Sequence, residues 1–478
     1  MTSFQHQNRP SSQLVSEFIS IVGEPFATID PDPAAPYLNE RRGVFHGRAR
    51  SFLRPGTVAE VSEILRLADQ TKTAIVPHGG NTGLVGGQTP DRSGDQIVVA
   101  LDRLDRIRSV DSDGDTMTVE AGVTLRRARE AAATAGRLFP LAIGSMDTCQ
   151  IGGNVSSNAG GIAVLSYGST RHLVLGLEVV LPGGEIINGL RAVRKDNAGY
   201  DLKQLFIGAE GTLGIITAAT LKLFPTPRGQ ATAFVGVASP AEALSLFHVA
   251  RGRVSFELTS FELMPRICLD YCLRHLDNAE DPLSEPHPWY VIAEMSSGRS
   301  AESAHEDFDR ILDEGRRMGA VRDATVAVTE SQRRALWRLR YSLSDVQRPE
   351  GVSIKHDISV PISAIPEFIA AASAAVTELI PGCRPVPFGH LGDGNIHFNI
   401  SQPEKGDGGT FRAREKDLNK VIFGLVEKHG GSIAAEHGVG QMKRDILPTV
   451  RGPAEIGAMR NIKAALDPNN IMNPGKVL

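Results

Sequence analysis

Glycine crowds into one stretch of this chain, between Gly79 and Gly214, and this crowding constrains the fold more than any other feature. There are 49 glycines among 478 residues. Because glycine lacks a side chain, its backbone reaches conformations and close approaches that other residues cannot. We therefore expect this stretch to hold its backbone close to a large ligand. A chain of this length is also too long for one hydrophobic core, so it divides into two domains or more.

The first glycine-rich run follows Ala74–Val76, which we expect to be a short buried strand. It extends from Pro77 to Gly87, and its five glycines let consecutive amides point one way. Such a nest of amides can hold pyrophosphate oxygens without a lysine. The alternative is a flexible surface loop, because glycine-rich loops alone are weak indicators. The sequence contains neither the P-loop pattern nor a strand-GxGxxG-helix unit, which argues against those two nucleotide sites.

The densest glycine segment extends from Gly144 to Gly161, and a third lies at Gly208–Thr217. Small residues and side-chain amides in the segment Gly144–Gly161 allow the backbone to approach a flat ring and to hydrogen-bond its edge. Between them, 174–181 reads as a strand. The acidic run Asp111–Asp115 superficially resembles a calcium loop, but its glycine is misplaced and the closing glutamate is missing, so we expect a hairpin turn.

A second feature lies near the other end of the chain, where His390 and His397 flank a Gly-Asp-Gly-Asn turn. The alternation Ile396, Phe398, Ile400 predicts a strand, and Asp-Gly is a hairpin turn signal. A hairpin can bring the two imidazoles together, which begins a metal site. Two hydrogen-bonded strand histidines are the plainer alternative.

The segment 431–435 reads as a small apolar strand that ends in Glu436 and His437. At a strand end both side chains can turn toward one cavity. Beside the hairpin, they would supply a third ligand and a base. Two histidines with one carboxylate leave coordination positions open, as in catalytic rather than structural metal sites.

The second half reads as alternating strands and helices after a hinge at Pro225–Gly229, which favours an antiparallel sheet covered by helices. On a helix predicted over 329–346, Arg340 and Ser344 share a face. On a strand predicted over 353–360, Lys355 and Asp357 share a face. Arginine and lysine there suit a carboxylate substrate, although a solvated charged face is the simpler reading. Further predicted elements are strands 231–237, 289–294 and 324–328 and a helix 301–318.

Composition excludes some classes of function. The net charge of -4 argues against nucleic acid as a partner. Four cysteines without a CxxC pair suit a reducing cytoplasm, and the polar first ten residues lack the apolar core of a signal peptide. No uninterrupted apolar run approaches the length of a membrane span. We expect a soluble, cytoplasmic protein.

Together these motifs resemble, in order and over roughly residues 40–478, the FAD-binding oxidoreductases of the vanillyl-alcohol-oxidase type. The resemblance is to the branch of D-2-hydroxyglutarate and D-lactate dehydrogenases. It implies an α+β protein with a two-part FAD-binding domain, an antiparallel-sheet substrate domain covered by helices, and a C-terminal helical segment packed back on the flavin domain. The implied divisions are an N-terminal segment 1–43, an FAD-binding domain 44–226, a substrate and metal domain 227–430 and a C-terminal segment 431–478.

The resemblance also implies which residues bind FAD. The position at which some relatives attach flavin covalently through histidine is Asn81, so we expect non-covalent FAD, and we read His78 as structural. The implied FAD-binding residues are Pro77, Gly79, Gly80, Asn81, Thr82, Gly83, Leu84, Gly144, Ser145, Asp147, Gly152, Gly153, Asn154, Ser157, Asn158, Gly160, Gly161, Glu210, Gly211, Gly214, Ile215, Ile216 and Asn473.

For the substrate domain, the resemblance implies a metal on His390, His397 and Glu436, with His437 as the proton acceptor. Zinc suits these ligands, and manganese, iron or cobalt fit them too. The implied substrate-binding residues are Arg340, Ser344, which replaces an expected threonine, Lys355, Asn399 and His437.

The implied reaction is FAD- and metal-dependent oxidation of D-2-hydroxyglutarate to 2-oxoglutarate, with hydride transfer from C2 to flavin N5. D-lactate or D-malate dehydrogenase is the nearest alternative, and a metal-dependent hydrolase is a distant one. Reduced flavin would pass its electrons to an electron-transfer flavoprotein or a quinone-linked carrier, and a homodimer is an open expectation.

Overall fold

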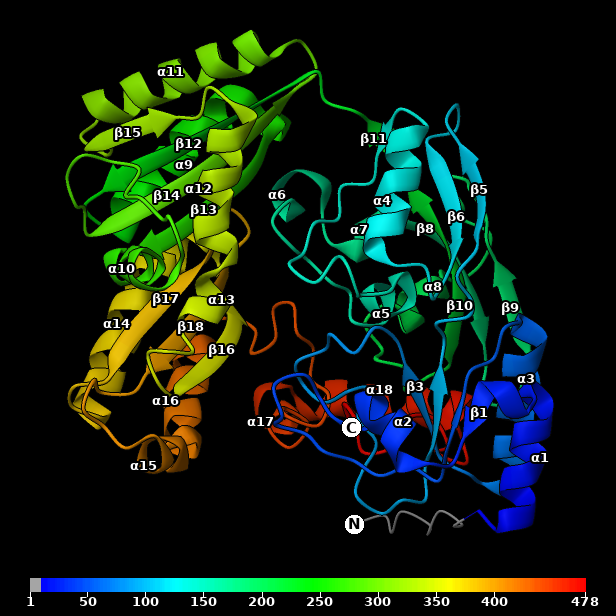
Figure 1. Cartoon of the computed structure of the whole chain (residues 1–478). Helices are drawn as coiled ribbons and strands as arrows, with labels where there is room; N and C mark the ends of the chain where they lie inside the picture. Colours follow the sequence, from blue (N-terminus) through cyan, green and yellow to red (C-terminus); the bar gives the residue numbers. More distant parts are fainter. Residues whose placement is uncertain (1–9) are drawn as a thin grey trace. The chain divides into compact units, whose positions relative to one another are not determined.

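The computed structural model describes residues 10–478, with the backbone alone for residues 31–34. The chain forms two compact units (Figure 1). Of the described residues, unit 1 comprises 10–160, Ser169–Thr226 and His437–Leu478, and unit 2 comprises Gly161–Gly168 and Pro227–Glu436. The expectation about a signal peptide concerns residues that lie, except for Pro10, outside the described ones.

The first sheet of unit 1 has the strand order β1-β2-β4-β3, and its inner strands are parallel. Thr57 caps the start of helix α3, where its hydroxyl accepts the amide of Glu60. The apolar side of this helix packs into the core of this sheet with Phe18 and Val22 of α1. The elements are α1 (Ser12–Val22), β1 (Ala27–Thr28), α2 (Pro31–Leu38), β2 (Ser51–Leu53), α3 (Val58–Thr71), β3 (Ile75–His78) and β4 (Ile97–Ala100).

The second sheet of unit 1 is antiparallel and has the order β5-β6-β10-β8-β9. The acidic run at Asp111–Asp115 is the turn of the β5–β6 hairpin, which confirms that prediction. The elements are β5 (Ile107–Asp111), β6 (Thr116–Glu120), α4 (Leu125–Thr134), β7 (Arg137–Leu138), α5 (Ile151–Ser156), α7 (Thr170–Leu173), β8 (Val174–Val180), β9 (Ile186–Gly189), α8 (Lys203–Phe206), β10 (Ile215–Lys222) and β11 (Phe224–Pro225).

The C-terminal segment completes unit 1. After α17 (Leu447–Val450) and α18 (Pro453–Leu466), the chain lies along β3, where the amide of Ile75 donates to the carbonyl of Ile471 at 2.8 Å. The amide of Asn473 in turn donates to the carbonyl of Ile75 at 2.8 Å. Lys463 holds this segment by donating to the carbonyls of Thr212 and Met472, each at 2.8 Å.

Unit 2 is built on a seven-stranded antiparallel sheet of order β15-β12-β14-β13-β17-β18-β16, flanked by helices. The expected α+β architecture is therefore confirmed. The strands are β12 (Gly229–Val237), β13 (Leu258–Pro265), β14 (Trp289–Ser297), β15 (Asp323–Val326), β16 (Ser353–Ser359), β17 (Arg384–His390) and β18 (Asn395–Ser401). The helices are α6 (Val164–Tyr167), α9 (Pro240–Val254), α10 (Arg266–His275), α11 (Ala301–Arg317), α12 (Glu330–Tyr341), α13 (Leu343–Val346), α14 (Ile365–Leu379), α15 (Gly408–Ala413) and α16 (Glu415–Lys428).

Two predicted elements of unit 2 are wrong in part. The segment 431–435 is not a strand: it makes a single bridge, between Ser432 and Ser359, and then leaves the sheet. The hydroxyl of Ser432 accepts the amide of Ala434, a local bond that competes with strand pairing. The predicted helix 329–346 is divided at Ser342 into α12 and α13.

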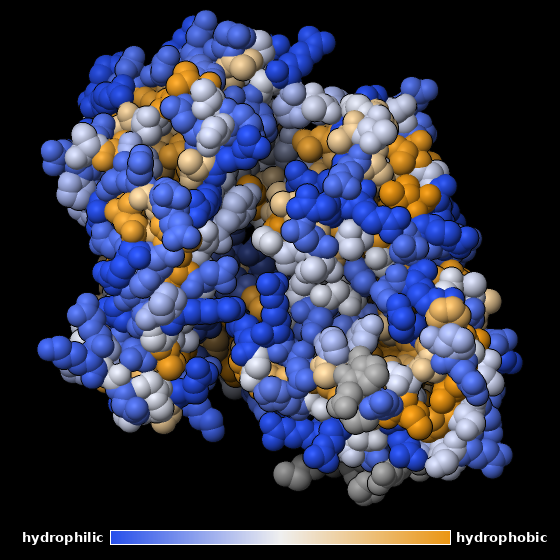
Figure 2. All heavy atoms as spheres, in the orientation of Figure 1, coloured by the Kyte–Doolittle hydropathy of each residue, from blue (hydrophilic) through white to orange (hydrophobic). Residues whose placement is uncertain are grey.

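One segment, Ile362–Leu379, is long and apolar enough by length and composition to cross a membrane. It comprises α14 and the turn before it, and α14 contacts α16 and β17 within unit 2. Its buried side chains, including Phe368 and Ile369, face those neighbours, and core helices of globular proteins pass the same test. On the face shown in Figure 2, hydrophilic residues predominate and hydrophobic residues form separate small groups.

Candidate active site

The β17–β18 hairpin brings His390 and His397 together, as its sequence predicted. His390 ends β17 and pairs with Asn395, while His397 pairs with Phe388. The two imidazole rings have centroids 5.5 Å apart and are inclined by 76°. The turn needs glycine at Gly394, because φ there is 91° and a Cβ would overlap the carbonyl oxygen of Val360.

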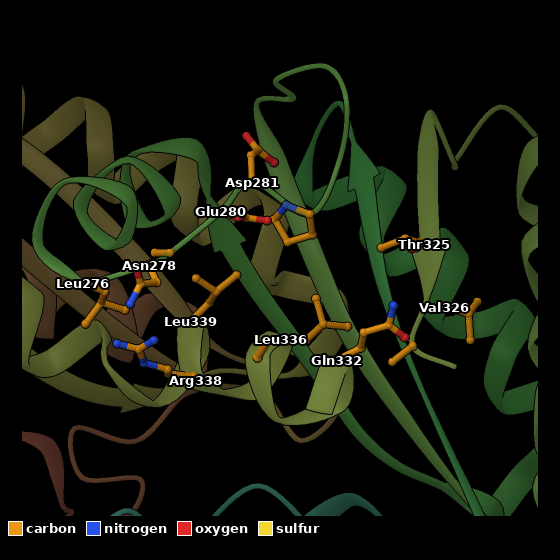
Figure 3. A pocket seen from close by; sticks show the side chains of 14 residues that line it. Leu276, Asn278, Glu280, Asp281, Thr325, Val326, Gln332, Leu336, Arg338 and Leu339 are labelled. Carbon is orange, nitrogen blue, oxygen red and sulfur yellow. The ribbon is translucent and has the colours of Figure 1, made fainter. Parts of the chain in front are cut away.

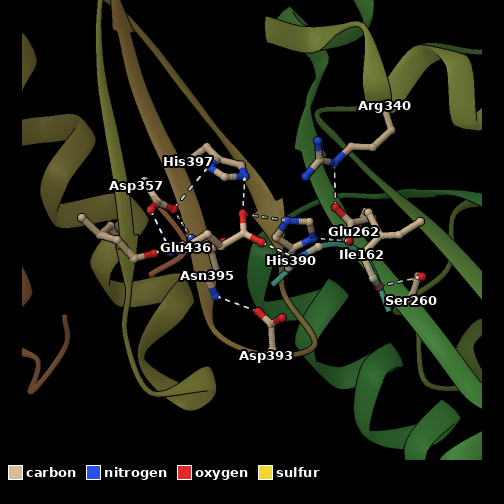
Figure 4. A network of polar contacts seen from close by, with 12 residues as sticks. Ile162, Ser260, Glu262, Arg340, Asp357, His390, Asp393, Asn395, His397 and Glu436 are labelled. Atoms are coloured by element: carbon tan, nitrogen blue, oxygen red, sulfur yellow. Dashed lines mark hydrogen bonds and ion pairs between the residues drawn. The ribbon is translucent and has the colours of Figure 1, made fainter. Parts of the chain in front are cut away.

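Glu436 joins the two histidines (Figure 4). Its Oε2 lies 3.7 Å from Nε2 of His390 and 3.8 Å from Nε2 of His397. These separations are too long for hydrogen bonds. Ligands at about 2.1 Å from a tetrahedral zinc lie about 3.4 Å apart, so the Glu436 oxygen would need to approach each histidine nitrogen by only a few tenths of an ångström. The donor set therefore fits a divalent metal.

The Glu436 carboxylate is fixed by its other contacts. Its Oε1 accepts the backbone amide of Gly161 at 2.5 Å, and its own amide donates to Oδ2 of Asp357 at 2.9 Å. Gly161 was predicted to bind flavin, yet it belongs to unit 2 and its amide is engaged by Glu436. Sequence reasoning offered no signal for this pairing, since the two residues are 275 positions apart.

Asp357 is a site residue that the sequence analysis did not identify as such. Its Oδ1 lies 3.6 Å from Nδ1 of His397 and accepts the side-chain amide of Asn395 at 3.0 Å. Asp357, His397 and Glu436 each offer a ligand atom, and these atoms lie within 4.8 Å of one another. Asp357 is thus either an alternative metal ligand or the carboxylate that orients His397. Its alternation with Lys355 on β16 was the available signal.

Glu262, in the middle of β13, is the second residue that was missed. It is 1% exposed, and its Oε1 lies 2.6 Å from Nδ1 of His390. Its Oε2 accepts the Nε–H of Arg340 at 2.6 Å. A glutamate in an apolar strand carries no recognisable pattern in the sequence, so only the register between β13 and β17 reveals it.

Burial and charge act against each other in this cluster. Burial would raise the pKa values of Glu262 and Glu436, but the histidine charges and, at Glu262, the Arg340 charge lower both. Burial would lower the pKa of His390, yet Glu262 and Glu436 raise it well above its usual range. At His397 burial prevails and lowers the pKa to about 3. The Glu436 carboxylate and the neutral His397 imidazole are thus in the forms that bind metals, whereas His390 would have to release a proton to bind one.

The predicted substrate-binding residues do not all gather at one point. Arg340 is 7% exposed and lies against Glu262, with its guanidinium 5.1 Å from the ring centre of Phe388. Lys355 is exposed, and its Nζ lies 3.3 Å from the carbonyl oxygen of Ser344. Asn399 is buried, pairs with Lys355 across the strands and donates to Gln347 at 2.9 Å. The Ser344 side chain is exposed.

In unit 1, the glycine-rich loop packs its backbone against the second glycine segment. A Cβ on Gly80 would overlap the carbonyl oxygen of Thr148, and one on Gly152 would collide with Ala121. By contrast, a Cβ on Gly153 or Gly144 would meet no described atom within 4 Å. The two segments therefore need glycine at Gly80 and Gly152 for close packing, and at Gly144 and Gly153 the lack of a side chain leaves space open.

Several predicted cofactor residues already bind other groups of unit 1. The Asn81 side chain donates to the carbonyls of Pro36 and Asn39, and Asp147 forms an ion pair with Arg126. Asn158 accepts from Ser169 and from the amide of Arg171. The Glu210 carboxylate accepts the amides of Val439 and Gly440 at 2.7 and 2.9 Å, which anchors the C-terminal segment.

Other groups of unit 1 offer free polar atoms beside this loop. Among residues 10–478, the buried Gln150 Oε1, Asn154 Nδ2 and Asn473 Oδ1 have no hydrogen-bond partner. Asn473 is held there by its amide nitrogen, which donates to the carbonyls of Gly87 and Glu210. Buried polar atoms without partners are costly, so a bound polar ligand is the expected partner. Open glycine-lined space and unpartnered amides together fit a dinucleotide.

A separate cavity of about 340 Å³ lies in unit 2 beside α12 and β15 (Figure 3). Leu336 and Leu339 line it together with Asn278 and Arg338. It contains none of the predicted site residues.

Comparison with known proteins gives consistent results for both halves of the chain. Residues 49–189 match the family described as FAD binding domain, and residues 226–477 match FAD linked oxidases, C-terminal domain. The chain is 36% identical to a mitochondrial D-2-hydroxyglutarate dehydrogenase of Danio rerio, covering 98% of this chain and 86% of the relative. It is also 36% identical to a D-2-hydroxyglutarate dehydrogenase of Xanthomonas citri, covering 88% of each. A putative mitochondrial D-lactate dehydrogenase of Schizosaccharomyces pombe is 35% identical, covering 98% of this chain and 90% of the relative.

Solved structures show the same fold. A substrate-bound p-cresol methylhydroxylase superposes with a TM-score of 0.77 at 17% identity, covering 97% of this chain and 96% of the other. Alkyldihydroxyacetonephosphate synthase superposes with a TM-score of 0.75 at 16% identity, covering 98% and 87%. The resemblance drawn from the motifs is confirmed: the chain belongs to the FAD-linked oxidases and is an FAD-dependent dehydrogenase.

Proposed function

We propose that this protein oxidises D-2-hydroxyglutarate to 2-oxoglutarate. The observation that carries the proposal is the Glu262 bridge, which places a buried arginine beside the histidine of a three-donor cluster. Arg340 binds Glu262 through Nε, and among the described residues its buried Nη2 has no hydrogen-bond partner. A substrate with a carboxylate at each end could bind the three-donor cluster through one end and Arg340 through the other. Relatives named for D-2-hydroxyglutarate support this substrate.

The two non-protein groups have separate tasks. A divalent metal held by His390, His397 and Glu436 would act as a Lewis acid that lowers the pKa of the substrate hydroxyl. FAD, when bound, accepts the hydrogen of C2 with its electron pair. Zinc suits the donor set, although manganese, iron or cobalt would accept the same ligands.

The protein's own residues position the substrate and move one proton. Arg340 binds the distal carboxylate through its Nη groups, and Asn399 helps to hold the C1 end. His437 accepts the hydroxyl proton, the general-base role that an imidazole fills most often in enzymes. The C–H bond and the O–H bond are broken, the C=O double bond forms, and two electrons leave with the hydride. Reoxidation then requires a carrier, for which we propose an electron-transfer flavoprotein or a quinone-linked protein.

Replacement of the proposed base tests the proposal. His437→Ala should abolish turnover of D-2-hydroxyglutarate while the purified protein keeps its flavin absorption band, because His437 handles only the proton. Turnover would be followed by stopped-flow bleaching of the flavin, with and without a chelator. A variant that keeps a near-normal bleaching rate would refute the role of His437.

D-lactate is the second candidate substrate, because one relative is a putative D-lactate dehydrogenase. A lactate methyl would leave the Nη2 of Arg340 unsatisfied, which disfavours it. The ratio of kcat/KM for the two acids decides between them, and a clear preference for D-lactate would refute our choice. The hydrolase alternative loses its basis, since the chain is an FAD-dependent dehydrogenase.

A further inference from the structure

We infer that Glu262 is a positioning residue that aims both the metal-binding nitrogen of His390 and the carboxylate-binding edge of Arg340. The inference rests on the proposed function, since that function assigns the two tasks to His390 and Arg340. Glu262 would touch neither substrate nor metal and would act only through its two partners.

The position of Glu262 follows from the sheet. It lies on β13 directly opposite His390 of β17 in the strand register, while Arg340 reaches it from α12 (Figure 4). Each carboxylate oxygen accepts one short hydrogen bond, of 2.6 Å, from a different partner. One carboxylate therefore holds a strand histidine and a helix arginine in fixed relation.

The contact with His390 determines which ring nitrogen is available. A carboxylate only accepts, so Nδ1 of His390 must carry the proton that it donates to Glu262. In the neutral imidazole this leaves the lone pair on Nε2, the nitrogen that lies 3.7 Å from Oε2 of Glu436. Such a carboxylate partner fixes both the tautomer and the ring orientation of a metal-binding histidine.

The contact between Glu262 and Arg340 uses Nε of the guanidinium and leaves its Nη2 available for a ligand. Glu262 engages Nε, and the Phe388 ring lies 5.1 Å from the guanidinium carbon. The Nη2 atom, buried and without a partner among the described residues, is the donor that remains. A buried donor in this state is expected to bind an acceptor that arrives with the substrate.

A purely structural ion pair is the competing explanation, and unit 2 supplies its counterpart. Glu294 lies on the neighbouring strand β14 and pairs with Arg333, from the same helix as Arg340, at 3.1 Å. Its other partners are Trp337 and Thr232, at 2.7 and 2.8 Å. Both glutamates are buried bridges from the sheet to α12, but only Glu262 contacts a histidine, so Glu294→Gln is a matched control.

The test compares Glu262→Gln with Glu294→Gln in the flavin-loaded, full-length protein. Glutamine presents one acceptor and one donor where both partners of Glu262 donate, so either the Arg340 contact or the His390 tautomer must change. Zinc affinity is measured by competition with a chromophoric chelator. We expect Glu262→Gln to weaken zinc binding by about 10- to 100-fold, a typical loss for such a partner. Glu294→Gln should stay within about 3-fold of wild type, because its bridge touches no ligand.

Substrate kinetics test the second half of the inference. With saturating zinc, Glu262→Gln should raise KM more for D-2-hydroxyglutarate than for D-2-hydroxybutyrate, which lacks the distal carboxylate. Glu262→Asp keeps the charge but shortens the side chain, and it should restore part of the zinc affinity. If Glu262→Gln does not fold, Glu262→Asp replaces it in both measurements and should show smaller losses of the same kind.

The outcomes separate the two proposals. If the wild type binds zinc and prefers D-2-hydroxyglutarate but Glu262→Gln matches it in both readouts, the positioning role is overturned and the proposed function stands. Equal losses in Glu262→Gln and Glu294→Gln would likewise overturn it in favour of a structural bridge. If the wild type binds no divalent metal and does not bleach with D-2-hydroxyglutarate, the proposed function fails, and the positioning role fails with it.

Discussion

The two units build their candidate sites in opposite ways. In unit 1 the site consists of backbone and open space, with glycines that either touch another backbone segment, as Gly80 does, or leave room, as Gly153 does. In unit 2 the site consists of charged side chains, each held by another charged or polar group, as His390 is held by Glu262. The first kind of site is damaged by added atoms, whereas the second is damaged by atoms removed.

This difference follows from the ligands that each unit would bind. A dinucleotide is large and needs close approach and amide donors, which glycines provide. A metal ion is small and needs a few donor atoms at fixed distances, which depends on the groups behind each ligand. Five predictions test the contrast, beginning with the largest expected effect and ending with the smallest.

His397→Ala should weaken metal binding by about 100- to 1000-fold, one ligand's share of the roughly 10–16 kcal/mol found for whole zinc sites. His390 and Glu436 then supply only two of the three proposed ligands. Competition titration with zinc measures the loss. His305→Ala is the control, because the His305 ring contacts the backbone carbonyls of Ala301 and Ala327 in unit 2. Wild-type affinity in His397→Ala would remove this histidine from the site.

Gly80→Ala should destabilise unit 1 by about 1–3 kcal/mol and reduce flavin content, because the new methyl group overlaps the Thr148 carbonyl. Chemical denaturation and the flavin absorbance ratio measure the two effects. The contrasting variant is Gly153→Ala, whose methyl group meets no described atom.

Gly153→Ala should leave the free energy of unfolding of the flavin-free protein unchanged or raise it slightly, since alanine favours the helix. Its FAD affinity should nevertheless fall if the open space is where the cofactor lies. Unchanged FAD affinity in Gly153→Ala, or unchanged stability in Gly80→Ala, would break the distinction between packed and open glycines.

Lys463→Met should cost roughly 1–3 kcal/mol of stability, because the carbonyls of Thr212 and Met472 and the carboxylate of Asp467 lose a shared donor. The loss would be seen as a lower denaturation midpoint with little change in metal affinity. Lys428→Met, at an exposed position on α16, is the control. A loss of metal binding as large as that of stability would contradict the separate construction of the two sites.

Ser344→Ala should have the smallest effect, within about 0.5 kcal/mol of stability, as is usual for a surface substitution. The hydroxyl is exposed, and Lys355 contacts the backbone carbonyl of Ser344, which the substitution keeps. KM for D-2-hydroxyglutarate should change by less than about 3-fold. A tenfold rise in KM would instead show that the hydroxyl binds the substrate.

Some structural features could be predicted from the sequence because they depend only on neighbouring residues. The alternation after Gly394 predicts β18, and the turn residues predict its hairpin. The order of the glycine motifs identified the family and, through it, the fold. The predicted strand at 431–435 was wrong because a single bridge at Ser432 replaces a ladder, an outcome that depends on the neighbouring strand.

The tertiary structure alone decided which residues stand behind the site. Glu262 and His390 are 128 positions apart, and Gly161 and Glu436 are 275 positions apart. Contacts between such distant residues depend on strand register and on the path of the chain between strands. The spacing of residues in the sequence therefore does not predict them. The sequence by itself determined the motifs, the hairpin and the donor residues, because periodicity and turn chemistry act over a few residues. Folding decided how Glu262, Asp357 and Gly161 hold those donors, because hydrogen bonds between distant segments form only once the sheet is assembled.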